Sequence, residues 1–272
     1  MNRKILILGK GFIGSRLKEA LNCNISTEKI YSLNDAERLM NIFKPKIIIN
    51  CIGHIGINVD DCEKDLDKTL MSNTFVPIIL AEAAIRNKIK LVHVSSGCIY
   101  KYNFTKDKPI TENKTPDFFD LFYSRSKIYT ERALEVLAKR FNILIVRIRI
   151  PLDNRPHPRN ILAKIIKYQK IIDIPNSVTY LPDFIKVLQH LIKINAKGIY
   201  NIVNKGSLRY SKLAGVYKKY IPSFEYKVIP FKKLNLIRTN LLLSSGKLEK
   251  SGFKIRNIQE VLEECVKDYL KY

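Results

Sequence analysis

The stretch ILILGKGFIG, residues 5–14, stands near the start of the chain and sets its architecture. Ile5 to Leu8 form an apolar run that predicts a buried strand, and the helical pattern Phe12–Leu21 follows directly. Glycines between a strand and a helix permit a tight turn, a close approach of the backbone to a diphosphate, and close contact between the two elements. The candidate dinucleotide-binding residues are therefore Gly9, Gly11, Phe12, Ile13 and Gly14.

Strand and helix patterns alternate through the first half of the chain. The expected strands are Ile5–Leu8, one near Cys23–Ile25, Ile47–Asn50, Leu91–Ser95 and Ile143–Ile148. The helical patterns between them are Phe12–Leu21, Asp35–Phe43, Met71–Asn87 and Tyr123–Arg140. This order predicts an α/β fold, a Rossmann-type doubly wound parallel sheet, because parallel strands need crossover helices that cover both faces.

After Pro151 the alternation loosens, and a basic, turn-rich segment spans residues 154–160. Further expected helices are Ile161–Tyr168, Phe184–Ile194 and Ile258–Tyr269. Strands near Ile171–Ile174 and at Ile199–Val203 suggest a return to the sheet. We therefore expect a dinucleotide-binding domain over residues 1–150, rejoined by about 176–203, and a smaller C-terminal substrate lobe built mostly from 151–272.

The composition predicts a folded domain without a membrane span. With 272 residues, 46% of them hydrophobic, the chain can bury a sizeable core, which excludes a disordered protein. Its apolar runs fall far short of the roughly 20 residues that cross a bilayer, and Gly9 interrupts the first run too early for a signal peptide. Five scattered cysteines argue against a disulfide framework or a metal site, so we expect a cytoplasmic protein in a reducing compartment.

The charge is strongly positive, since 48 Lys+Arg against 25 Asp+Glu gives a formal net charge of +23. Such a field attracts polyanions, including nucleic acids and phosphorylated ligands. The lysines are spread along the whole chain, however, without a long basic run or an aromatic-rich RNA-binding motif. We therefore expect no specific nucleic-acid partner, although the chain carries a high positive charge.

Two hydroxyl groups and an amine form a candidate acid–base group. Tyr123 and Lys127 lie four residues apart and so share one face of a helix. A tyrosine hydroxyl, with an unperturbed pKa of about 10, becomes useful near neutrality only when a cation such as Lys127 stabilises its phenolate. Ser96 closes the fourth expected strand, where an α/β sheet presents its ligands, and can bond a substrate carbonyl.

These three features, in this order, resemble the extended short-chain dehydrogenase/reductase family, in which they form one active site. The likeness is closest to the nucleotide-rhamnose synthase/epimerase-reductase group and covers almost the whole chain. It rests on Asn58–Glu63, Ser96–Tyr100, Phe118–Phe119, Phe122–Ser124, Arg147–Pro151, Pro158–Asn160, Ile174–Ser177, Gly198–Asn201 and Arg238–Asn240. Members of that group epimerise UDP- or dTDP-4-keto-6-deoxyglucose at carbons 3 and 5 and reduce the 4-ketone with a nicotinamide cofactor.

The resemblance implies two groups for the epimerisation, which must remove a proton from one face of the sugar and return one on the other. Cys98 lies two residues after Ser96, at the place where GDP-fucose synthases also have a cysteine. Lys164 fits the lysine four residues after Pro-Arg-Asn in the rhamnose group, and a desolvated lysine can serve as acid or base. His157 competes for this second role, because histidine titrates nearer neutrality.

Further contacts are implied by the same resemblance. Arg159, Asn160 and Arg238 are candidate substrate ligands, since a guanidinium can grip phosphate oxygens bidentately. Gly53 and Asn73 match positions that line the cofactor, beside Tyr123 and Lys127. NADPH is preferred over the alternative NADH, because no acid that would bind a ribose 2′-OH is evident after the second strand. Glu28 lies in the region, whereas Asp35 is better explained as a helix-start residue.

Two departures from the group concern the cofactor and the sugar. The glycine loop is one residue shorter than the usual Gly-x-x-Gly-x-x-Gly, and Ser244 replaces an acid expected after Arg238 and Asn240. The sequence thus predicts a 3,5-epimerase/4-keto-reductase that forms an L-rhamnose-type nucleotide sugar, with homodimerisation as a further expectation. The alternatives are a 3-epimerase/4-reductase of a 2-acetamido sugar nucleotide and a non-catalytic, RNA-associated dinucleotide sensor.

Overall fold

Six strands form the large sheet of the computed structural model, which describes residues 2–234 and 236–272. The strands are β1 Asn2–Leu8, β2 Cys23–Ser26, β3 Ile47–Asn50, β4 Lys90–Ser96, β5 Ile143–Ile148 and β9 Gly198–Asn201. Their order is β2-β1-β3-β4-β5-β9, and β1 pairs in parallel with β2 and β3, as β3 does with β4. The prediction of an α/β fold with a parallel central sheet is confirmed.

The order of the strands reverses its direction between β1 and β3. After β2 the chain crosses β1 and continues at β3, so the connections that follow β1 and β3 leave the sheet in opposite directions. Ligands of open α/β sheets bind outside the carboxyl ends of the strands at such a point. The glycine loop Gly9–Gly14 follows β1 and the segment Cys51–Gly53 follows β3, so both stand where the strand order reverses.

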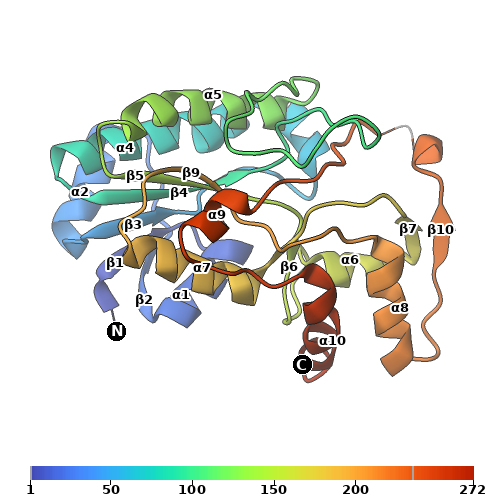
Figure 1. The fold of residues 1–272 in the computed structure, drawn as a ribbon. Helices are drawn as coiled ribbons and strands as arrows, with labels where there is room; N and C mark the ends of the chain where they lie inside the picture. Colours follow the sequence, from blue (N-terminus) through green and yellow to red (C-terminus); the bar gives the residue numbers. More distant parts are fainter. Residues whose placement is uncertain (1, 235) are drawn as a thin grey trace. The chain divides into compact units, whose positions relative to one another are not determined.

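Helices cover both faces of the sheet, as Figure 1 shows: α2, α4 and α5 lie on one face and α1 on the other. Their bounds are α1 Phe12–Leu21, α2 Leu33–Phe43, α4 Val76–Arg86 and α5 Phe122–Ala138. Apolar side chains of the strands and of the helices α2, α4 and α5 form one buried cluster, which includes Leu6, Ile48, Leu91, Ile145, Leu39, Leu80 and Leu134. Burial of these residues stabilises the sheet by the hydrophobic effect.

The helical segment before β4 differs from the expected single helix Met71–Asn87. It begins earlier, as α3 Leu66–Leu70, passes through a π-helical turn Met71–Phe75, and continues as α4 to Arg86. A short 3-10 helix, Val59–Glu63, precedes it. A π turn contains an additional residue and is often found at functional sites. Asn73 lies within this turn.

The chain divides into two compact units, which are described separately. Unit 1 comprises Met1–Ile99, Pro116–Arg147 and Ile192–Tyr200. Unit 2 comprises Tyr100–Thr115, Ile148–Leu191 and Asn201–Tyr272. The returning segment of unit 1 is fixed by the buried Lys90, whose Nζ donates to Asn195 Oδ1 (3.1 Å) and to the Ala196 carbonyl (2.7 Å).

Unit 2 contains short strands and a cluster of helices. Its elements are β6 Pro151–Leu152, α6 Ile161–Tyr168, β7 Lys170–Ile172, β8 Thr179–Tyr180, α7 Leu181–Lys193, α8 Tyr210–Tyr220, β10 Lys227–Ile229, η3 Phe231–Leu234, α9 Gly246–Lys250 and α10 Ile258–Tyr269. The expected strand near Ile171–Ile174 does not return to the large sheet, because β7 pairs with β10. β9, by contrast, does take its place in that sheet.

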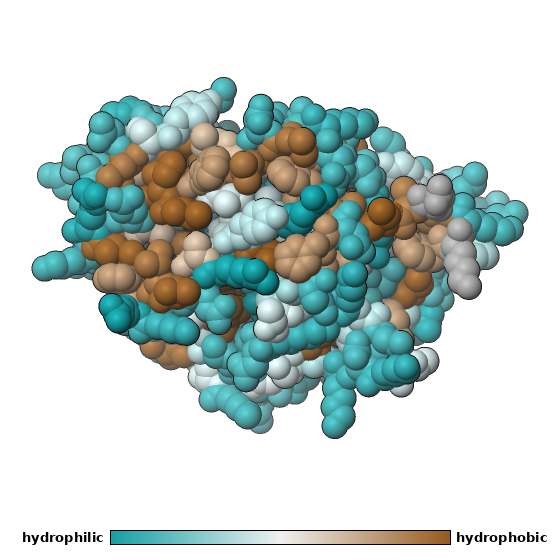
Figure 2. All heavy atoms as spheres, turned by 90° about the horizontal axis from the view of Figure 1, so that it is seen from above, coloured by the Kyte–Doolittle hydropathy of each residue, from teal (hydrophilic) through white to brown (hydrophobic). Residues whose placement is uncertain are grey.

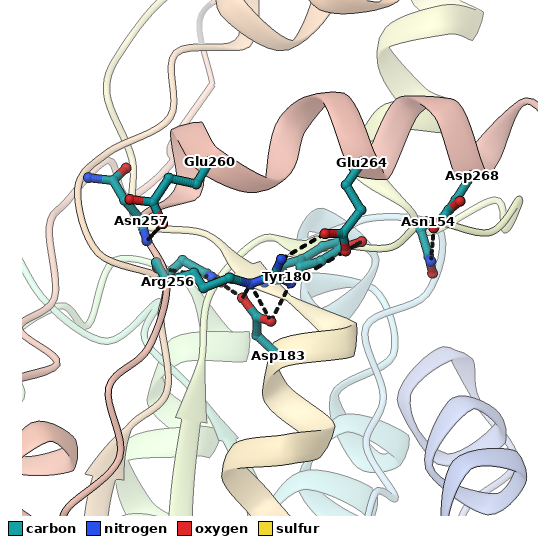
Figure 3. Close-up of polar contacts among 9 residues, drawn as sticks. Asn154, Tyr180, Asp183, Arg256, Asn257, Glu260, Glu264 and Asp268 are labelled. Atoms are coloured by element: carbon teal, nitrogen blue, oxygen red, sulfur yellow. Dashed lines mark hydrogen bonds and ion pairs between the residues drawn. The ribbon is translucent and has the colours of Figure 1, made fainter.

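An ion pair between the buried Asp183 and the half-buried Arg256 links α7 to the start of α10 within unit 2 (Figure 3). Arg256 binds Asp183 through Nε and Nη2, at 3.1 Å and 2.6 Å to Oδ1, and it also reaches Glu264 Oε2 through Nη1 (2.7 Å). The Tyr180 hydroxyl donates to Glu264 Oε1 (3.1 Å), and Asn204 Nδ2 donates to Asp183 (2.7 Å). The buried carboxylate of Asp183 is thus fully supplied with donors.

Residues 2–234 and 236–272 contain neither a membrane-spanning helix nor a cluster of metal-ligating side chains. No helix in this part of the chain combines the length and the apolar character needed to cross a bilayer. Nor do its His, Cys, Asp and Glu side chains gather in any group of three that could hold a metal ion.

Candidate active site

In the glycine loop there is space for a side chain at Gly11 but none at Gly9 or Gly14. Gly9 has φ +98°, a conformation that side chains disfavour, and its N–H donates to the Ser26 carbonyl at 3.1 Å. A Cβ on Gly14 would lie 1.9 Å from the Gly9 carbonyl oxygen, so Gly14 permits the close contact of α1 with β1. A Cβ on Gly11 would meet nothing within 4 Å.

This arrangement fits a dinucleotide diphosphate. Gly11 is the N-cap of α1, where backbone N–H groups without helical partners and the helix dipole favour an anion. Phe12 is buried in the core and Ile13 is half-buried, so these two residues hold the loop rather than extend from it. At the end of β2, Glu28 is paired with Arg38 (2.6 Å), and Asp35 forms a capping box with Ser32, which confirms its expected role as a helix-start residue.

Gly53, Asn73 and Lys127 meet at the end of β3. A Cβ built on Gly53 would lie 3.2 Å from Asn73 Oδ1 and 3.4 Å from Lys127 Nζ, so the lysine ammonium stands against the backbone of this loop. Asn73, in the π turn, accepts a hydrogen bond from the His54 N–H (2.7 Å) and donates to the His54 carbonyl (2.9 Å). The amide of Asn73, predicted to line the cofactor, therefore holds the main chain of the loop that contains Gly53.

The end of β4 and the start of α5 are joined by hydrogen bonds. The Ser96 hydroxyl oxygen accepts from the Cys98 N–H (3.1 Å), and Ser124 Oγ donates to the Cys98 carbonyl (2.6 Å). Ser124 follows Tyr123 directly, so the turn after Ser96 is fixed to the helix that holds Tyr123 and Lys127. Four of the predicted catalytic residues thus stand in joined segments of unit 1: Ser96 ends β4, Cys98 lies in the turn that follows, and Tyr123 and Lys127 lie on α5.

Lys127 is buried, and its pKa depends on the opposing effects of burial and of a nearby negative charge. Burial lowers the pKa of Lys127 to about 8, while the negative charge of Glu131 opposes this fall. The pKa of His93, on β4, lies well below its usual value because of burial and of the nearby lysine. Burial raises the pKa of the Cys51 thiol to about 12. A lysine with a pKa near 8 can be an ammonium at neutral pH and can respond to small changes around it.

Two acidic residues whose roles sequence reasoning missed support α5, the helix that contains Tyr123 and Lys127. Glu63 Oε1 accepts a hydrogen bond from the Phe122 N–H at the start of α5, at 2.5 Å. Glu131, one turn after Lys127, accepts from Ser95 Oγ at 2.5 Å and from Arg147 Nη2 at 2.6 Å. The i, i+4 spacing of Lys127 and Glu131 was the signal in the sequence that could have revealed the second residue.

In unit 2, three cations lie close enough to influence one another. Lys164, on α6, is half-buried, and its pKa is lowered by burial and by the positive charges of Arg159 and Arg238. The pKa of His157 is lowered by burial and by Arg159, and its Nδ1 accepts from the Arg159 N–H (3.0 Å). A group of cations in which one amine has a lowered pKa is suited to bind a diphosphate and to exchange a proton.

The side chain of Asn160 is fully engaged within unit 2. It is the N-cap of α6, and its Oδ1 accepts from the Leu162 N–H (3.2 Å), while its Nδ2 donates to the carbonyls of Asp153 (2.7 Å) and Arg155 (2.9 Å). Asn160 therefore shapes the segment that presents Arg159. Ser244, which replaces an expected acid, accepts from the Gly246 N–H at 3.2 Å.

Comparison with known proteins supports these observations. A bifunctional dTDP-4-dehydrorhamnose 3,5-epimerase/dTDP-4-dehydrorhamnose reductase of Arabidopsis thaliana is 30% identical over 280 residues, which cover 96% of this chain and 91% of the relative. A trifunctional UDP-glucose 4,6-dehydratase/UDP-4-keto-6-deoxy-D-glucose 3,5-epimerase/UDP-4-keto-L-rhamnose-reductase from the same plant is 29% identical over 97% of this chain. The chain spans 42% of the length of that relative.

Solved structures of rhamnose-forming enzymes are similar to this chain in fold. The crystal structure of the L780 UDP-rhamnose synthase from Acanthamoeba polyphaga mimivirus matches with a TM-score of 0.90 at 26% identity, covering 97% of this chain and 98% of that one. A dTDP-4-dehydrorhamnose reductase from Bacillus anthracis, solved in complex with NADP, has the same fold, with a TM-score of 0.84 at 20% identity over 97% and 98% of the two chains. The predicted resemblance to rhamnose synthases and epimerase-reductases is thereby confirmed. Since the family model described as the RmlD substrate binding domain matches residues 3–271, the chain belongs to that family.

Proposed function

We propose that the protein is a nucleotide-sugar 3,5-epimerase/4-keto-reductase. It converts a UDP- or dTDP-linked 4-keto-6-deoxyhexose to an L-rhamnose-type nucleotide sugar with NADPH. The observation that carries the proposal is the buried ammonium of Lys127, which stands against the Gly53 loop on the same helix face as Tyr123. The relatives named above, with their printed epimerase and reductase activities, support the same reaction.

For the cofactor, the loop from Gly9 to Gly14 and the N-terminus of α1 would hold the diphosphate, and Lys127 would hold the nicotinamide ribose. NADPH, when bound, supplies the hydride for sugar carbon 4. Tyr123 donates a proton to the oxygen at carbon 4 as that carbon is reduced, and Ser96 donates a hydrogen bond to the same oxygen. The positive charge of Lys127 stabilises the phenolate that Tyr123 becomes.

The epimerisation needs two further groups. The 4-ketone acidifies the hydrogens on carbons 3 and 5, so a base can remove one of these protons to give an enolate, and an acid can return a proton on the opposite face. We assign these roles to Cys98 and Lys164, with His157 as the competitor of Lys164. The lowered pKa of Lys164 supports this choice, because an amine that titrates nearer neutrality both accepts and donates a proton more readily.

Arg159 and Arg238 would bind the nucleotide diphosphate, because a guanidinium can form two parallel hydrogen bonds with phosphate oxygens. Their influence on Lys164 supports this assignment, since both lie near the proposed acid–base group. For location, five free thiols favour a reducing cytosol.

A homodimer is part of the proposal. Exposed apolar side chains stand on the π turn and on α5, among them Phe75, Tyr129 and Val136. Figure 2 looks down on the side where Figure 1 places α4 and α5, and it shows hydrophobic side chains gathered there. A second copy of the chain would cover these helices. Sedimentation of wild type and of Val136→Glu tests this, since a monomer at micromolar concentration in both would rule the dimer out.

One experiment tests the reaction. The protein is incubated in D2O with NADPH and, in turn, UDP- and dTDP-4-keto-6-deoxyglucose, and the products are followed by NMR. We expect oxidation of NADPH, a rhamnose nucleotide, and deuterium at carbons 3 and 5. No oxidation across a panel of 4-keto nucleotide sugars would overturn the proposal, and deuterium at carbon 3 alone with a 2-acetamido sugar would favour the alternative substrate. Parallel titrations with NADPH and NADH decide the cofactor.

A further inference from the structure

Beneath the catalytic helix lies a buried polar group that the reaction itself does not use. It consists of Ser95 on β4, Glu131 on α5 and Arg147 on β5, which are 3%, 1% and 1% exposed. Glu131 Oε1 accepts from Ser95 Oγ (2.5 Å), and Glu131 Oε2 accepts from Arg147 Nε (2.8 Å) and Nη2 (2.6 Å). Three neighbouring elements of unit 1 are thereby joined through a single carboxylate.

The place of this carboxylate relates it to the active site. Glu131 lies four residues after Lys127 on α5, and side chains at this spacing are neighbours on a helix. Ser95 directly precedes Ser96 in β4, so the same carboxylate is bonded to the strand that ends in the proposed substrate-binding hydroxyl. Its two oxygens are occupied by donors on β4 and β5, which fix the position of the negative charge.

The other titratable groups that influence Lys127 come from three elements. They are Cys51 after β3, Cys62 on the 3-10 helix, and His93 on β4. Burial raises the pKa of both thiols and lowers the pKa of His93, so all three are neutral at pH 7. Among the described groups that influence the pKa of Lys127, Glu131 therefore contributes the negative charge.

A buried ion pair is an inefficient way to stabilise a core. Apolar side chains of similar volume often stabilise a protein as well as a buried Arg–Glu pair, because both charges lose their hydration. The Glu131–Arg147 pair lies beside a lysine whose charge the proposed reaction requires and which burial tends to neutralise. A negative charge held one helical turn away favours the charged form of that lysine.

We propose that Glu131 is a positioning residue for Lys127: held by Ser95 and Arg147, it places a fixed negative charge one helical turn away, which keeps the lysine an ammonium at neutral pH. This inference deepens the proposed function, because the ammonium is what stabilises the phenolate of Tyr123. Ser95 and Arg147 act through Glu131 and do not touch the substrate.

The test measures the titration of Lys127 without any substrate. Protein labelled with 13Cε-lysine is titrated by NMR, and the signal of Lys127 is identified by its absence in Lys127→Arg. We expect a midpoint near 8 in wild type. In Glu131→Gln we expect a midpoint lower by about one unit or more, a tenfold loss of proton affinity. Glu131→Asp, which keeps the charge, should restore most of the difference.

The matched control is Glu135→Gln, which removes an exposed carboxylate one turn further along α5 and should leave the midpoint unchanged. If Glu131→Gln does not fold, Glu131→Gln/Arg147→Met takes its place, because it removes both members of the buried pair together. A fall of the midpoint in the same direction but of smaller size is expected, because the cation of Arg147 is removed together with the anion. A lower melting temperature with an unchanged midpoint would reduce Glu131 to a structural role and overturn the proposal.

A second measurement relates the titration to the reaction. The alkaline limb of the pH profile of kcat/KM for ketone reduction should move to lower pH in Glu131→Gln by as much as the NMR midpoint does. If no 4-keto sugar is reduced while the midpoint still moves, the proposed function fails and the role of Glu131 stands. If reduction proceeds while the midpoint stays at its wild-type value, the role of Glu131 fails alone.

Discussion

Asn73 binds both main-chain polar groups of His54: its Oδ1 accepts from the His54 N–H at 2.7 Å, and its Nδ2 donates to the His54 carbonyl at 2.9 Å. The pair fixes the loop in which Gly53 stands against Lys127. Asn73→Asp replaces the donor by an oxygen that repels the carbonyl. We expect the Kd for NADPH to rise about tenfold, the cost of one lost hydrogen bond to a buried group.

A fluorescence titration with NADPH measures this change. The control is Asn87→Asp, which removes a comparable bond from Asn87 Nδ2 to the Ala83 carbonyl (2.8 Å) at the end of α4 and should leave the Kd unchanged. An unaltered Kd in Asn73→Asp would show that the loop does not need this amide.

The glycine loop predicts opposite outcomes for two alanine substitutions. Gly11→Ala places a methyl group where nothing lies within 4 Å, so the melting temperature should not fall, whereas the methyl group should obstruct the diphosphate and weaken NADPH binding. Gly14→Ala places a Cβ 1.9 Å from the Gly9 carbonyl oxygen and should lower both stability and binding. Calorimetry with and without NADPH separates the two, and equal stability losses would contradict the assignment.

Glu63 binds the start of α5 from a distant part of unit 1. Its Oε1 accepts from the Phe122 N–H, where the helix dipole also favours a negative charge. Glu63→Ala should cost about 1 kcal/mol of unfolding free energy and should lower kcat, because Tyr123 lies in the first turn of α5. Urea unfolding checks the first effect. Glu82→Ala, which removes an exposed ion pair with Arg86 on α4, should cost less than about 0.5 kcal/mol.

The ion pair of Arg256 and Asp183 in Figure 3 predicts a large loss of stability when one partner is removed. Asp183 is buried, so Arg256→Met leaves a carboxylate without its cation and should cost about 3 kcal/mol. Asp183→Asn/Arg256→Met should recover part of this loss in a double-mutant cycle. Arg209→Met, at an exposed pair with Asp173, serves as the control and should cost about 1 kcal/mol or less. Equal losses in the two arginine variants would refute the distinction.

Lys90 gives a prediction for pH. Burial, and then the charge of Lys197, lower its pKa to about 8. Between that value and the usual 10.5 the unfolded chain binds more protons at this lysine than the folded chain, so this group adds stability as the pH rises. The unfolding free energy of wild type minus that of Lys90→Met should therefore increase through this range. The corresponding difference for Lys46→Met, an exposed lysine, should stay flat.

Local patterns predicted much of the fold. The glycine loop, the alternation of strands and helices, and the bounds of α1 and α6 followed from the sequence, because each depends on residues close together in the chain. The partner of β7 did not, because three residues around Ile171 contain no information about which strand they join. Charged residues such as Arg147 were equally hard to place, because burial of an arginine depends on a partner that only the tertiary structure supplies.

The candidate site shows the same division. The spacing of Tyr123 and Lys127 and the position of Ser96 at a strand end were legible, and these residues stand on joined elements. Asn73 was placed at the cofactor by resemblance, whereas its contact with His54 depends on a π turn that the apolar pattern of the helix does not reveal.

Because of that π turn, the number of residues in Met71–Phe75 determines how the helical segment is built. A π turn takes up one residue more than an α turn, so a chain shorter by one residue within Met71–Phe75 would form an unbroken helix from Leu66 to Arg86. Its first turn would be rotated by about 100° about the helix axis. A single-codon deletion here would therefore regularise the helix and at the same time withdraw the amide from the loop. The support of the loop therefore depends on the length of this segment as well as on the amide of Asn73.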